Sequence, residues 1–458
     1  MKIADLLPQY TAENQHLKNV VVNGVGIDSR HLAPGALFVA IEGDRVDGHD
    51  FIEQAIANGA GAVMVSRPVR ASVPVIVVPN TRLALQQMAA YYRNQWNIPM
   101  VAVTGSCGKT TTKNILAQIL SAHQSTLSTK GNLNNLFGLP LTLFQLQSQH
   151  ACGVFELGAS CRGEIARLAE ILCPDIAIIT NAGASHLAHM GGSVRAIAEE
   201  KGALFSALPS DGLAVINVED AHAAYWVSIL GARDWVGFTV SGYTHPDINM
   251  QQCKAIYRAT QVVTLPEGHR FTVQSANSAF TVVMPLAGQH NIANALAAIA
   301  VAQYLGVPNE VISEALAATQ AEPGRLQTYH GKGRALIDDS YNANPQSFLA
   351  AIEVLANCEP GQKVLVMGDM AELDEAGVTY HQDIGKAARA QGIDQLFCFG
   401  ELSRHAAEAF GDQAQYFACK DALLAALSQA LPQQWCVLVK GSRSTGMEYV
   451  TQQLKGWL

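Results

Sequence analysis

One turn of the sequence carries the residue types that bind phosphate. Residues 100–112 read MVAVTGSCGKTTT, in which an apolar run predicts a buried strand that ends at Gly105, and a helix is predicted to begin near Lys109. This order gathers backbone N–H groups and a helix N-terminus around one point, which favours a bound phosphate. The Lys109 ammonium suits the β- and γ-phosphates of a nucleotide, and the Thr110 hydroxyl suits Mg²⁺. The predicted phosphate site comprises Gly105, Ser106, Cys107, Gly108, Lys109 and Thr110.

This turn departs from the usual pattern at one position. The pattern G-x-x-x-x-G-K-[ST] has a glycine where this chain has Val103. An ordinary glycine-rich turn between a strand and a helix is the alternative. The order of strand, glycines, Lys-Thr and helix favours nucleotide binding over that alternative.

Two further polar side chains stand near the ends of predicted strands, where an α/β sheet binds its ligands. Glu156 closes the run GVFE, and its carboxylate oxygens are donors that Mg²⁺ prefers. Without the phosphate turn, a strand end that faces water explains Glu156 equally well. His186 follows the run at 175–180, and a lone histidine is more often structural. The two are candidate metal ligands only if the phosphate turn lies beside them.

Three polar residues lie in predicted helices, and the pattern of each allows either a structural or a functional interpretation. Lys201, in a helix predicted over 194–208, has the pattern of an exposed lysine. Asn291 and Asn294 are three residues apart and so share one face of an otherwise apolar helix predicted over 290–304. Amide groups on such a face need partners, and the edge of a purine is one candidate. Capping of the helix start explains Asn291 as well, but Asn294 less well.

Two polar loops follow predicted strands in the last third of the chain. Residues 338–345 read DDSYNANP and include Asp339 and Asn342, which suit contacts to a nucleotide or a metal. An Asx-rich turn before a helix that starts with proline is the alternative. Residues 439–444 read VKGSRS and offer Lys440 and Arg443 to an anion, or else form a loop with solvated charges.

The elements that must position these residues predict an α/β protein of three domains. Residues 1–80 form a small α/β unit, residues 81–316 a central P-loop unit with a mostly parallel sheet and an antiparallel flank at 253–286, and residues 317–458 a Rossmann-like unit. In the third unit, strands are predicted at 334–338, 364–368, 395–399 and 436–440, with helices near 346–357, 379–391, 420–430 and 446–455. The third unit lacks G-x-G-x-x-G, so no dinucleotide cofactor is indicated.

Composition limits the class of protein. The 458 residues are 49% hydrophobic and 15% charged, which is enough apolar material for several cores. The net charge of −8 argues against nucleic acid or an anionic membrane as a partner. Nine scattered cysteines without a C-x-x-C pair indicate reduced thiols. With neither a signal peptide nor a run of ~20 apolar residues, we expect a cytoplasmic protein that does not insert into a membrane.

These motifs together resemble the Mur ligase family over essentially the whole chain. The shared motifs are TGSCGKT at 104–110, Glu156, Asn181 with His186, GQHN at 288–291 with Asn294, Gly324 with Arg325, and DSYN at 339–342. The stretches GNLNN at 131–135, DDSYNANP at 338–345, VMGDMAEL at 366–373 and VKGSR at 439–443 are similar to those of the family member that adds D-alanyl-D-alanine. Val103 then fits the shorter G-x-x-G-K-T form of this family.

The resemblance implies an ATP-dependent amide ligase. ATP would phosphorylate the terminal carboxylate of a UDP-N-acetylmuramoyl-tripeptide, and D-alanyl-D-alanine would attack the acyl phosphate. Such a ligase would serve bacterial peptidoglycan synthesis, and with it cell shape and division, and we expect a monomer.

The resemblance also implies roles for residues that their own pattern leaves open. Glu156 and His186 would hold Mg²⁺, Thr110 and Thr111 would lie at the metal that bridges the ATP phosphates, and Lys201 would be carbamylated. The nucleotide would be held by Asn291, Asn294, Arg325, Asp339 and Asn342. Ser29 and Arg30 would grip the uridine end, although by pattern alone they form a turn. The family-specific residues Asn134, Asn135, Lys440 and Arg443 are candidates for substrate contact.

One departure and two rivals remain. The family often has an Asn-His pair after the metal glutamate, where this chain has Ser160 and Cys161. The first rival is another ligase of the family, which adds diaminopimelate or lysine, or glutamate to a folate. The second is a P-loop protein that binds nucleotide as a switch without joining substrates.

Overall fold

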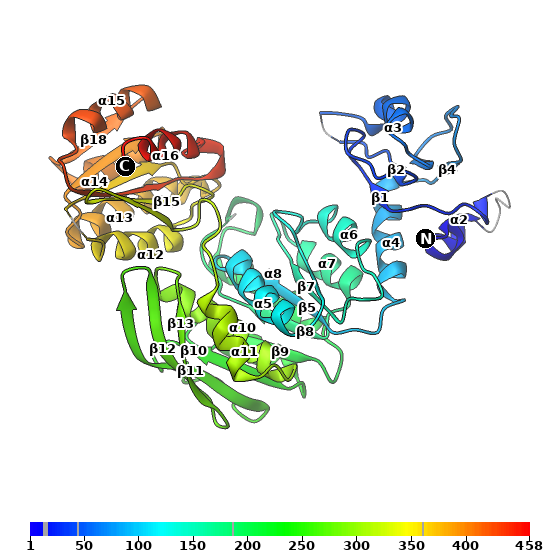
Figure 1. Cartoon of the computed structure of the whole chain (residues 1–458), viewed down its shortest axis with the longest axis horizontal. Coiled ribbons are helices and arrows are strands. Elements are labelled where there is room, and N and C mark those ends of the chain that lie inside the picture. The colour runs from blue at the N-terminus through cyan, green and yellow to red at the C-terminus, as the bar shows by residue number, and fades with distance from the viewer. Residues whose placement is uncertain (12–16, 44, 186, 360) are drawn as a thin grey trace.

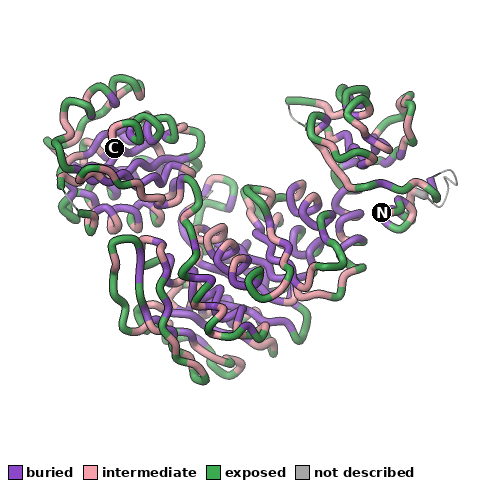
Figure 2. The backbone as a smooth tube through the Cα atoms, in the orientation of Figure 1, coloured by how far each residue is buried: buried purple, intermediate pink, exposed green. Residues whose placement is uncertain are grey.

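The computed structural model describes residues 1–11, 17–43, 45–185, 187–359 and 361–458. Three α/β parts follow one another along the chain, each around its own sheet, and the middle part lies between the other two (Figure 1). The buried backbone runs along the strands of each sheet, with exposed helix faces and loops outside (Figure 2). The prediction of an α/β fold with three parts is therefore confirmed.

The first part is built on a parallel sheet of four short strands in the order β1-β2-β3-β4. The strands are β1 Val25–Gly26, β2 Leu37–Val39, β3 Ala62–Val65 and β4 Val75–Val77, and the helices before and within the sheet are α1 Ile3–Leu6, α2 Pro8–Thr11, η2 Gly48–Phe51 and α3 Ile52–Ala57. Leu37 and Val39 face one core and Phe38 the other, as expected for strands covered on both sides.

Helix α4, Thr81–Arg93, joins the first part to the second and is anchored at both ends. The Thr81 hydroxyl donates to the Ala40 carbonyl of the first part over 2.8 Å. At the other end, the Arg93 guanidinium donates to the carbonyls of Leu172 (2.7 Å) and Cys173 (2.9 Å) in the second part. The link between the two parts is therefore a helix held at each end by a hydrogen bond to a backbone carbonyl.

The second part has a nine-stranded sheet in the order β13-β12-β11-β10-β9-β8-β5-β7-β6. Its parallel strands are β5 Met100–Thr104, β6 Thr126–Ser128, β7 Cys152–Glu156, β8 Ile176–Ile179, β9 Leu213–Asn217 and β10 Trp235–Thr239. The next strand, β11 Cys253–Leu265, pairs parallel with β10, and β12 Gly268–Gln274 and β13 Ala279–Met284 extend the sheet antiparallel from it. The predicted antiparallel flank is confirmed, whereas β10 was not predicted.

Helices cover both faces of this sheet. One core contains α4, α6 Gly138–Leu143, α7 Glu164–Leu172, α8 Val194–Ser206 and α9 Ala223–Leu230; the other contains α5 Lys109–His123, α10 Gln289–Tyr304 and α11 Asn309–Ala317. Along β5, Met100 and Ala102 face the first core and Val101 and Val103 face the second. A strand with both faces buried reads as a continuous apolar run, which is why β5 was recognisable in the sequence.

The third part has a six-stranded sheet in the order β14-β15-β19-β16-β17-β18. All pairs are parallel except for the edge strand β14 Gln327–Gly331 against β15 Arg334–Asp339; the other strands are β16 Gln362–Gly368, β17 Gln395–Phe399, β18 Ala414–Phe417 and β19 Trp435–Lys440. Its helices are α12 Pro345–Ala356, α13 Gly377–Ala390, α14 Ser403–Phe410, α15 Lys420–Ala430 and α16 Glu448–Lys455, with η4 Asp374–Ala376 and η5 Arg443–Thr445. The four predicted strands are confirmed, and β14 and β18 are additions at the two edges.

Two expectations from composition can be compared with the described residues. All nine cysteines lie among them and none forms a disulfide. None of the described helices is both long and apolar enough to span a lipid bilayer.

Candidate active site

The phosphate turn is shaped by two glycines that no other residue could replace without strain. After β5, Gly105 has a φ of +153° and Gly108, which precedes α5, a φ of +82°. A Cβ on Gly105 would lie 1.8 Å from the Thr180 hydroxyl, and one on Gly108 would lie 2.3 Å from Asn294 Oδ1. The backbone can therefore pass close to Thr180 at Gly105 and close to α10 at Gly108 only because both positions are glycine.

The turn is braced by the segment that follows β8. The Cys107 N–H donates to Asn181 Oδ1 (2.9 Å), and Asn181 Nδ2 donates back to the Cys107 carbonyl (3.1 Å). The Ser106 hydroxyl donates to the Gly183 carbonyl over 2.9 Å. These bonds within the protein fix the shape of the turn.

Lys109 lies over the turn that it begins. Its Nζ donates to the carbonyls of Gly105 (2.6 Å) and Ser106 (3.3 Å). Burial lowers the pKa of Lys109, while the nearby Glu156 carboxylate opposes that shift. An ammonium held by backbone carbonyls in this way is available to an incoming phosphate, which is a stronger partner.

Glu156 ends β7 with its side chain almost wholly buried, at 2% exposure. Its Oε1 accepts from Asn134 Nδ2 over 2.8 Å, and its backbone N–H donates to the Thr129 hydroxyl over 3.1 Å. Its Oε2 is buried and has no hydrogen-bond partner among the described residues. A buried carboxylate oxygen left without a donor is a site for a cation, because otherwise its desolvation is uncompensated.

Lys201 is not the exposed residue that its pattern suggested. On α8 it is 4% exposed, and its ammonium has no hydrogen bond or ion pair within the described part of the chain. Burial, and to a smaller extent the positive charge of Lys109, lower its pKa to about 7. The interpretation of Lys201 as a solvated helical lysine is therefore wrong, because α8 turns this side chain toward the phosphate turn and away from water.

The remaining metal candidate, His186, lies outside the described residues. No group of three or more His, Cys, Asp or Glu side chains able to hold a metal occurs in the described ranges. A metal at Glu156 would accordingly need oxygen donors from a bound nucleotide, from Thr110, or from a modified Lys201.

The two asparagines of α10 contact each other, and Asn294 also contacts α5. Asn291 Nδ2 donates to the Ala287 carbonyl (2.7 Å), and Asn294 Nδ2 donates to Asn291 Oδ1 (3.0 Å). Asn294 Oδ1 accepts from the Thr112 hydroxyl of α5 over 3.2 Å. The amides thus have protein partners, and together they hold α10 against the start of α5.

Two residues of the third part contact the phosphate turn. Arg325 donates to the Thr110 hydroxyl over 3.1 Å, and its guanidinium lies 4.2 Å from the centre of the Tyr341 ring. Asn344 caps the start of α12 and its Nδ2 donates to the Cys107 sulfur over 3.1 Å. The second and third parts therefore meet at the turn itself.

Asp339 and Lys440 form a buried ion pair at the ends of β15 and β19. Lys440 Nζ lies 2.5 Å from Asp339 Oδ2 and also donates to the Asn342 carbonyl over 3.1 Å. Burial raises the pKa of Asp339, although the Lys440 charge opposes this shift. Arg443 remains exposed, 5.8 Å from the Tyr341 ring centre.

The other predicted substrate residues lie apart from the turn or have local partners. In the first part, the Ser29 hydroxyl donates to Gln54 Oε1 (2.7 Å), and Arg30 forms an exposed ion pair with Asp28 (2.8 Å). That guanidinium holds the pKa of Asp28 well below its usual range. Asn135 Oδ1 accepts from the Gly138 N–H over 2.9 Å at the start of α6.

Three residues that sequence reasoning gave no such role surround the Glu156 site. Asn134, predicted as a substrate contact, orients the Glu156 carboxylate. Thr129 accepts from the Glu156 backbone, and Lys113, 4% exposed, donates to the Thr129 carbonyl over 2.7 Å. Lys113 lies four residues after Lys109 and so on the same face of α5, and this spacing in the sequence could have indicated that Lys113 lies near the site.

Comparison with known proteins assigns all three parts to one family. The profiles described as "Mur ligase family, catalytic domain", "Mur ligase middle domain" and "Mur ligase, glutamate ligase domain" match residues 21–93, 103–302 and 324–443. A curated UDP-N-acetylmuramoyl-tripeptide--D-alanyl-D-alanine ligase from Escherichia coli (strain K12) is 41% identical over 440 residues, covering 95% of this chain and 94% of the relative.

Two solved structures are similar over almost the full length. MurF from Acinetobacter baumannii superposes with a TM-score of 0.90 at 34% identity, covering 98% of both chains. MurF ligase from Thermotoga maritima in complex with ADP gives a TM-score of 0.81 at 27% identity, covering 95% of this chain and 97% of that one.

Proposed function

The chain belongs to the Mur ligase family, and we propose that it is the ATP-dependent ligase that joins D-alanyl-D-alanine to UDP-N-acetylmuramoyl-tripeptide. Relatives with this name cover the chain almost from end to end. The product is a peptidoglycan precursor, so the enzyme acts in cell-wall synthesis. We place it in the cytoplasm as a monomer, with domain boundaries near residues 80 and 316.

The terminal carboxylate of the tripeptide is a poor electrophile, so it must be activated before an amine can attack it. The terminal carboxylate of the tripeptide attacks the γ-phosphorus of ATP, the bond to ADP breaks, and an acyl phosphate forms. The free amine of D-alanyl-D-alanine then attacks the acyl carbon, loses a proton, and expels phosphate. Because a carboxylate and a triphosphate repel each other, the site must supply positive charge and hold both groups in line.

The observation that carries this proposal is the unpaired Oε2 of Glu156 beside the phosphate turn. Its chemistry fits Mg²⁺, which would be held by Glu156, Thr110 and, by resemblance, His186 and a carbamylated Lys201. Bound there, Mg²⁺ would neutralise phosphate charge. The lowered pKa of Lys201, about 7, supports carbamylation, because only the neutral amine reacts with CO₂.

The protein's own groups supply the remaining contacts. The N–H groups at the start of α5, from Gly108 to Thr111, face no acceptor within the helix and would bind the phosphates, and Lys109 exchanges its carbonyl partners for phosphate oxygens. Arg325, already on Thr110, brings a second cation to the same point. Asn291, Asn294, Asp339 and Asn342 shape the nucleotide site.

The two ends of the acceptor substrate fall on different parts. Ser29 and Arg30 hold the uridine end, for which Arg30 would leave its exposed ion pair with Asp28. Asn134 and Asn135 lie on the tripeptide side of Glu156. The site of the incoming dipeptide is bordered by Lys440 and by the exposed Arg443. Lys440 is held in place by Asp339 and by the Asn342 carbonyl.

Phosphate release from ATP tests the proposal. Purified protein is given UDP-N-acetylmuramoyl-tripeptide with D-alanyl-D-alanine, or UDP-N-acetylmuramoyl-L-alanyl-D-glutamate with lysine or diaminopimelate, and each substrate is also omitted in turn. We expect release only when both tripeptide and D-alanyl-D-alanine are present, with the pentapeptide product confirmed by mass.

Two results would overturn it. Release that does not depend on the dipeptide would favour a nucleotide switch, and amide formation with lysine or diaminopimelate would favour another ligase of the family. Lys109→Ala serves as the inactive control, since it removes the cation at the phosphates while α5 keeps its capping glycine.

A further inference from the structure

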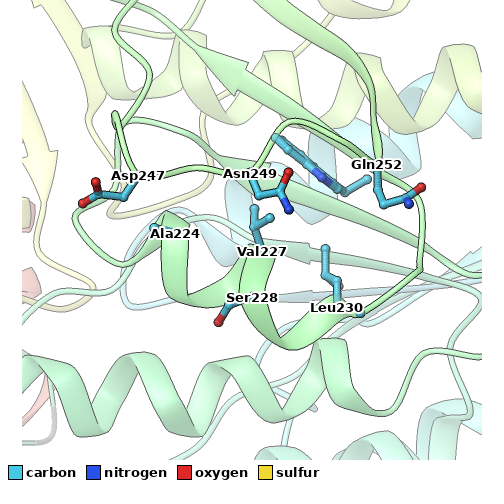
Figure 3. A pocket seen from close by; sticks show the side chains of 9 residues that line it. Ala224, Val227, Ser228, Leu230, Asp247, Asn249 and Gln252 are labelled. Atoms are coloured by element: carbon cyan, nitrogen blue, oxygen red, sulfur yellow. The ribbon is translucent and has the colours of Figure 1, made fainter.

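Two thiols of the third part contact each other. The thiol of Cys436 in β19 donates a hydrogen bond to the sulfur of Cys358, which follows the end of α12. By contrast, the cavity beside α9 is lined by apolar, aromatic and amide side chains, the Ser228 hydroxyl and the exposed Asp247 carboxylate (Figure 3). Of these two places, the thiol pair carries the groups that bond covalently to each other on oxidation.

The backbone also brings the two cysteines together. Cys436 faces the core beneath α12, whereas its neighbour Trp435 faces the core on the other side of the sheet. Across the sheet, Cys436 pairs with Lys363 of β16, and the Lys363 ammonium donates to the Ala356 carbonyl at the end of α12. Cys358 lies two residues beyond that carbonyl and packs against the same core as Cys436. The end of α12 is therefore held over the strand at Cys436.

The two thiols differ in exposure and in acidity. Cys358 is half-buried, whereas Cys436 is 0% exposed. The hydrogen bond from Cys436 and the positive charge of Lys363 lower the pKa of Cys358, while the same hydrogen bond and burial raise the pKa of Cys436. Cys358 is therefore the thiol that an oxidant meets as a thiolate, and Cys436 is the thiol that stays protonated beside it.

We propose that Cys358 and Cys436 form a reversible disulfide when the protein meets a peroxide. The Cys358 thiolate attacks one oxygen of hydrogen peroxide, the O–O bond breaks, and a sulfenic acid forms as hydroxide leaves. The Cys436 sulfur then attacks the Cys358 sulfur, the S–O bond breaks, and the Cys436 proton leaves with the hydroxyl group as water. Two thiols and one peroxide thus give one disulfide and two waters, and a dithiol reductant restores both thiols.

This pair lies away from the candidate active site. Strand β19 runs from Trp435, beside Cys436, to Lys440 at the site, and α12 runs from its cap Asn344 at the phosphate turn to Ala356, near Cys358. Oxidation therefore joins the far ends of two elements whose near ends carry site residues. The proposed disulfide is additional to the proposed ligase function and does not rest on it.

Hydrogen peroxide added to the native full-length protein tests the pair. After oxidation, the protein is unfolded in N-ethylmaleimide, which blocks the remaining thiols, and is digested without reductant. Mass spectrometry should find two peptides linked through Cys358 and Cys436, and dithiothreitol should separate them. The exposed Cys419 of the same part should still be alkylated at the peroxide concentration that forms this link.

Two serine variants separate a disulfide from simple oxidation. In Cys436→Ser, the sulfenic acid on Cys358 has no neighbouring thiol to react with, so dimedone should trap it, whereas the wild type should give little adduct. Cys419→Ser is the matched control and should form the link as the wild type does. The proposal is overturned if the native protein gives no linked peptide at a peroxide concentration that oxidises Cys419, or if Cys358 links as readily to another cysteine.

Discussion

Asn134 and Glu156, twenty-two positions apart in the chain, are joined by a 2.8 Å hydrogen bond that directs one carboxylate oxygen and leaves the other unpaired. The amide thereby decides which oxygen of Glu156 is free for a cation. A residue predicted as a substrate contact has in this structure a positioning role at the candidate metal site.

Replacing this amide should weaken metal use. We expect Asn134→Leu to lower kcat by about 10–100-fold and to raise the Mg²⁺ concentration needed for half-maximal rate, because outer contacts of a metal ligand have effects of this size. Asn132→Ala is the matched control, since Asn132 is exposed and only its backbone carbonyl bonds to Asn134. An unchanged Mg²⁺ dependence in Asn134→Leu would contradict the positioning role.

A methyl group in the phosphate turn should abolish nucleotide binding. Gly108→Ala places a Cβ 2.3 Å from Asn294 Oδ1, so the Asn294 amide must leave its bonds to Thr112 and Asn291, or α5 and α10 must move apart. Gly242→Ala has nearly the same φ, +81° against +82°, but nothing lies within 4 Å of its Cβ, so it adds only the backbone strain of about 1 kcal/mol. Calorimetric titration with ADP should detect binding to Gly242→Ala and none to Gly108→Ala. Equal affinities would show that the contact with Asn294 is not limiting.

The buried ammonium of Lys201 should cost stability in a pH-dependent way. Its pKa falls from 10.5 to about 7 on folding, so between these values the unfolded chain holds a proton that the folded chain does not. Stability therefore rises with pH across this interval, and the cost is complete below pH 7.

In CO₂-depleted buffer, Lys201→Met should be more stable than the wild type at pH 7 by about 1–3 kcal/mol, and the gap should close as the pH approaches 10.5. Denaturant unfolding at several pH values measures this difference, and the variant should have lost ligase activity. A gap that is independent of pH would mean that Lys201 is not desolvated in the folded protein.

The ion pair of Asp339 and Lys440 should behave as a structural unit. Asp339→Asn or Lys440→Met alone leaves a buried group without its partner and should lower the free energy of unfolding by about 3–5 kcal/mol. The double variant should lose less stability than the sum of the two single variants. Chemical unfolding of all four proteins gives the coupling, and additive losses would contradict a direct pair.

The sequence was informative wherever a function depends on neighbouring residues. Gly105, Gly108 and Lys109 lie within five positions, and β8 is an unbroken apolar run, so the turn and most of the sheet were predictable. Strand β10 has the same length as β5, and it was missed because its place in the sheet depends on pairing with β9 and β11, which are distant from one another in sequence.

Roles that depend on packing were not predictable from local pattern. Lys201 has the spacing of a surface lysine, and only the placement of α8 against the turn buries it. Lys440 was recognisable as a cation after a strand, but its partner Asp339 is 101 residues away. Likewise, the pairing of Asn344 with Cys107 joins two parts of the chain that no periodicity connects.

Helix α4 connects the part that holds Ser29 and Arg30 to the part that holds the phosphate turn, with Thr81 and Arg93 fastened at its two ends. The thirteen residues of this helix span about 20 Å. Adding or removing one turn would change the length of the helix by ~5.4 Å, which exceeds the length of one residue in an extended peptide. For the proposed ligase, the length of α4 therefore determines the distance between the first part and the phosphate turn. If Ser29 and Arg30 hold the uridine as proposed, the number of turns in α4 would limit how many amino acids fit between the uridine and the carboxylate that is to be extended.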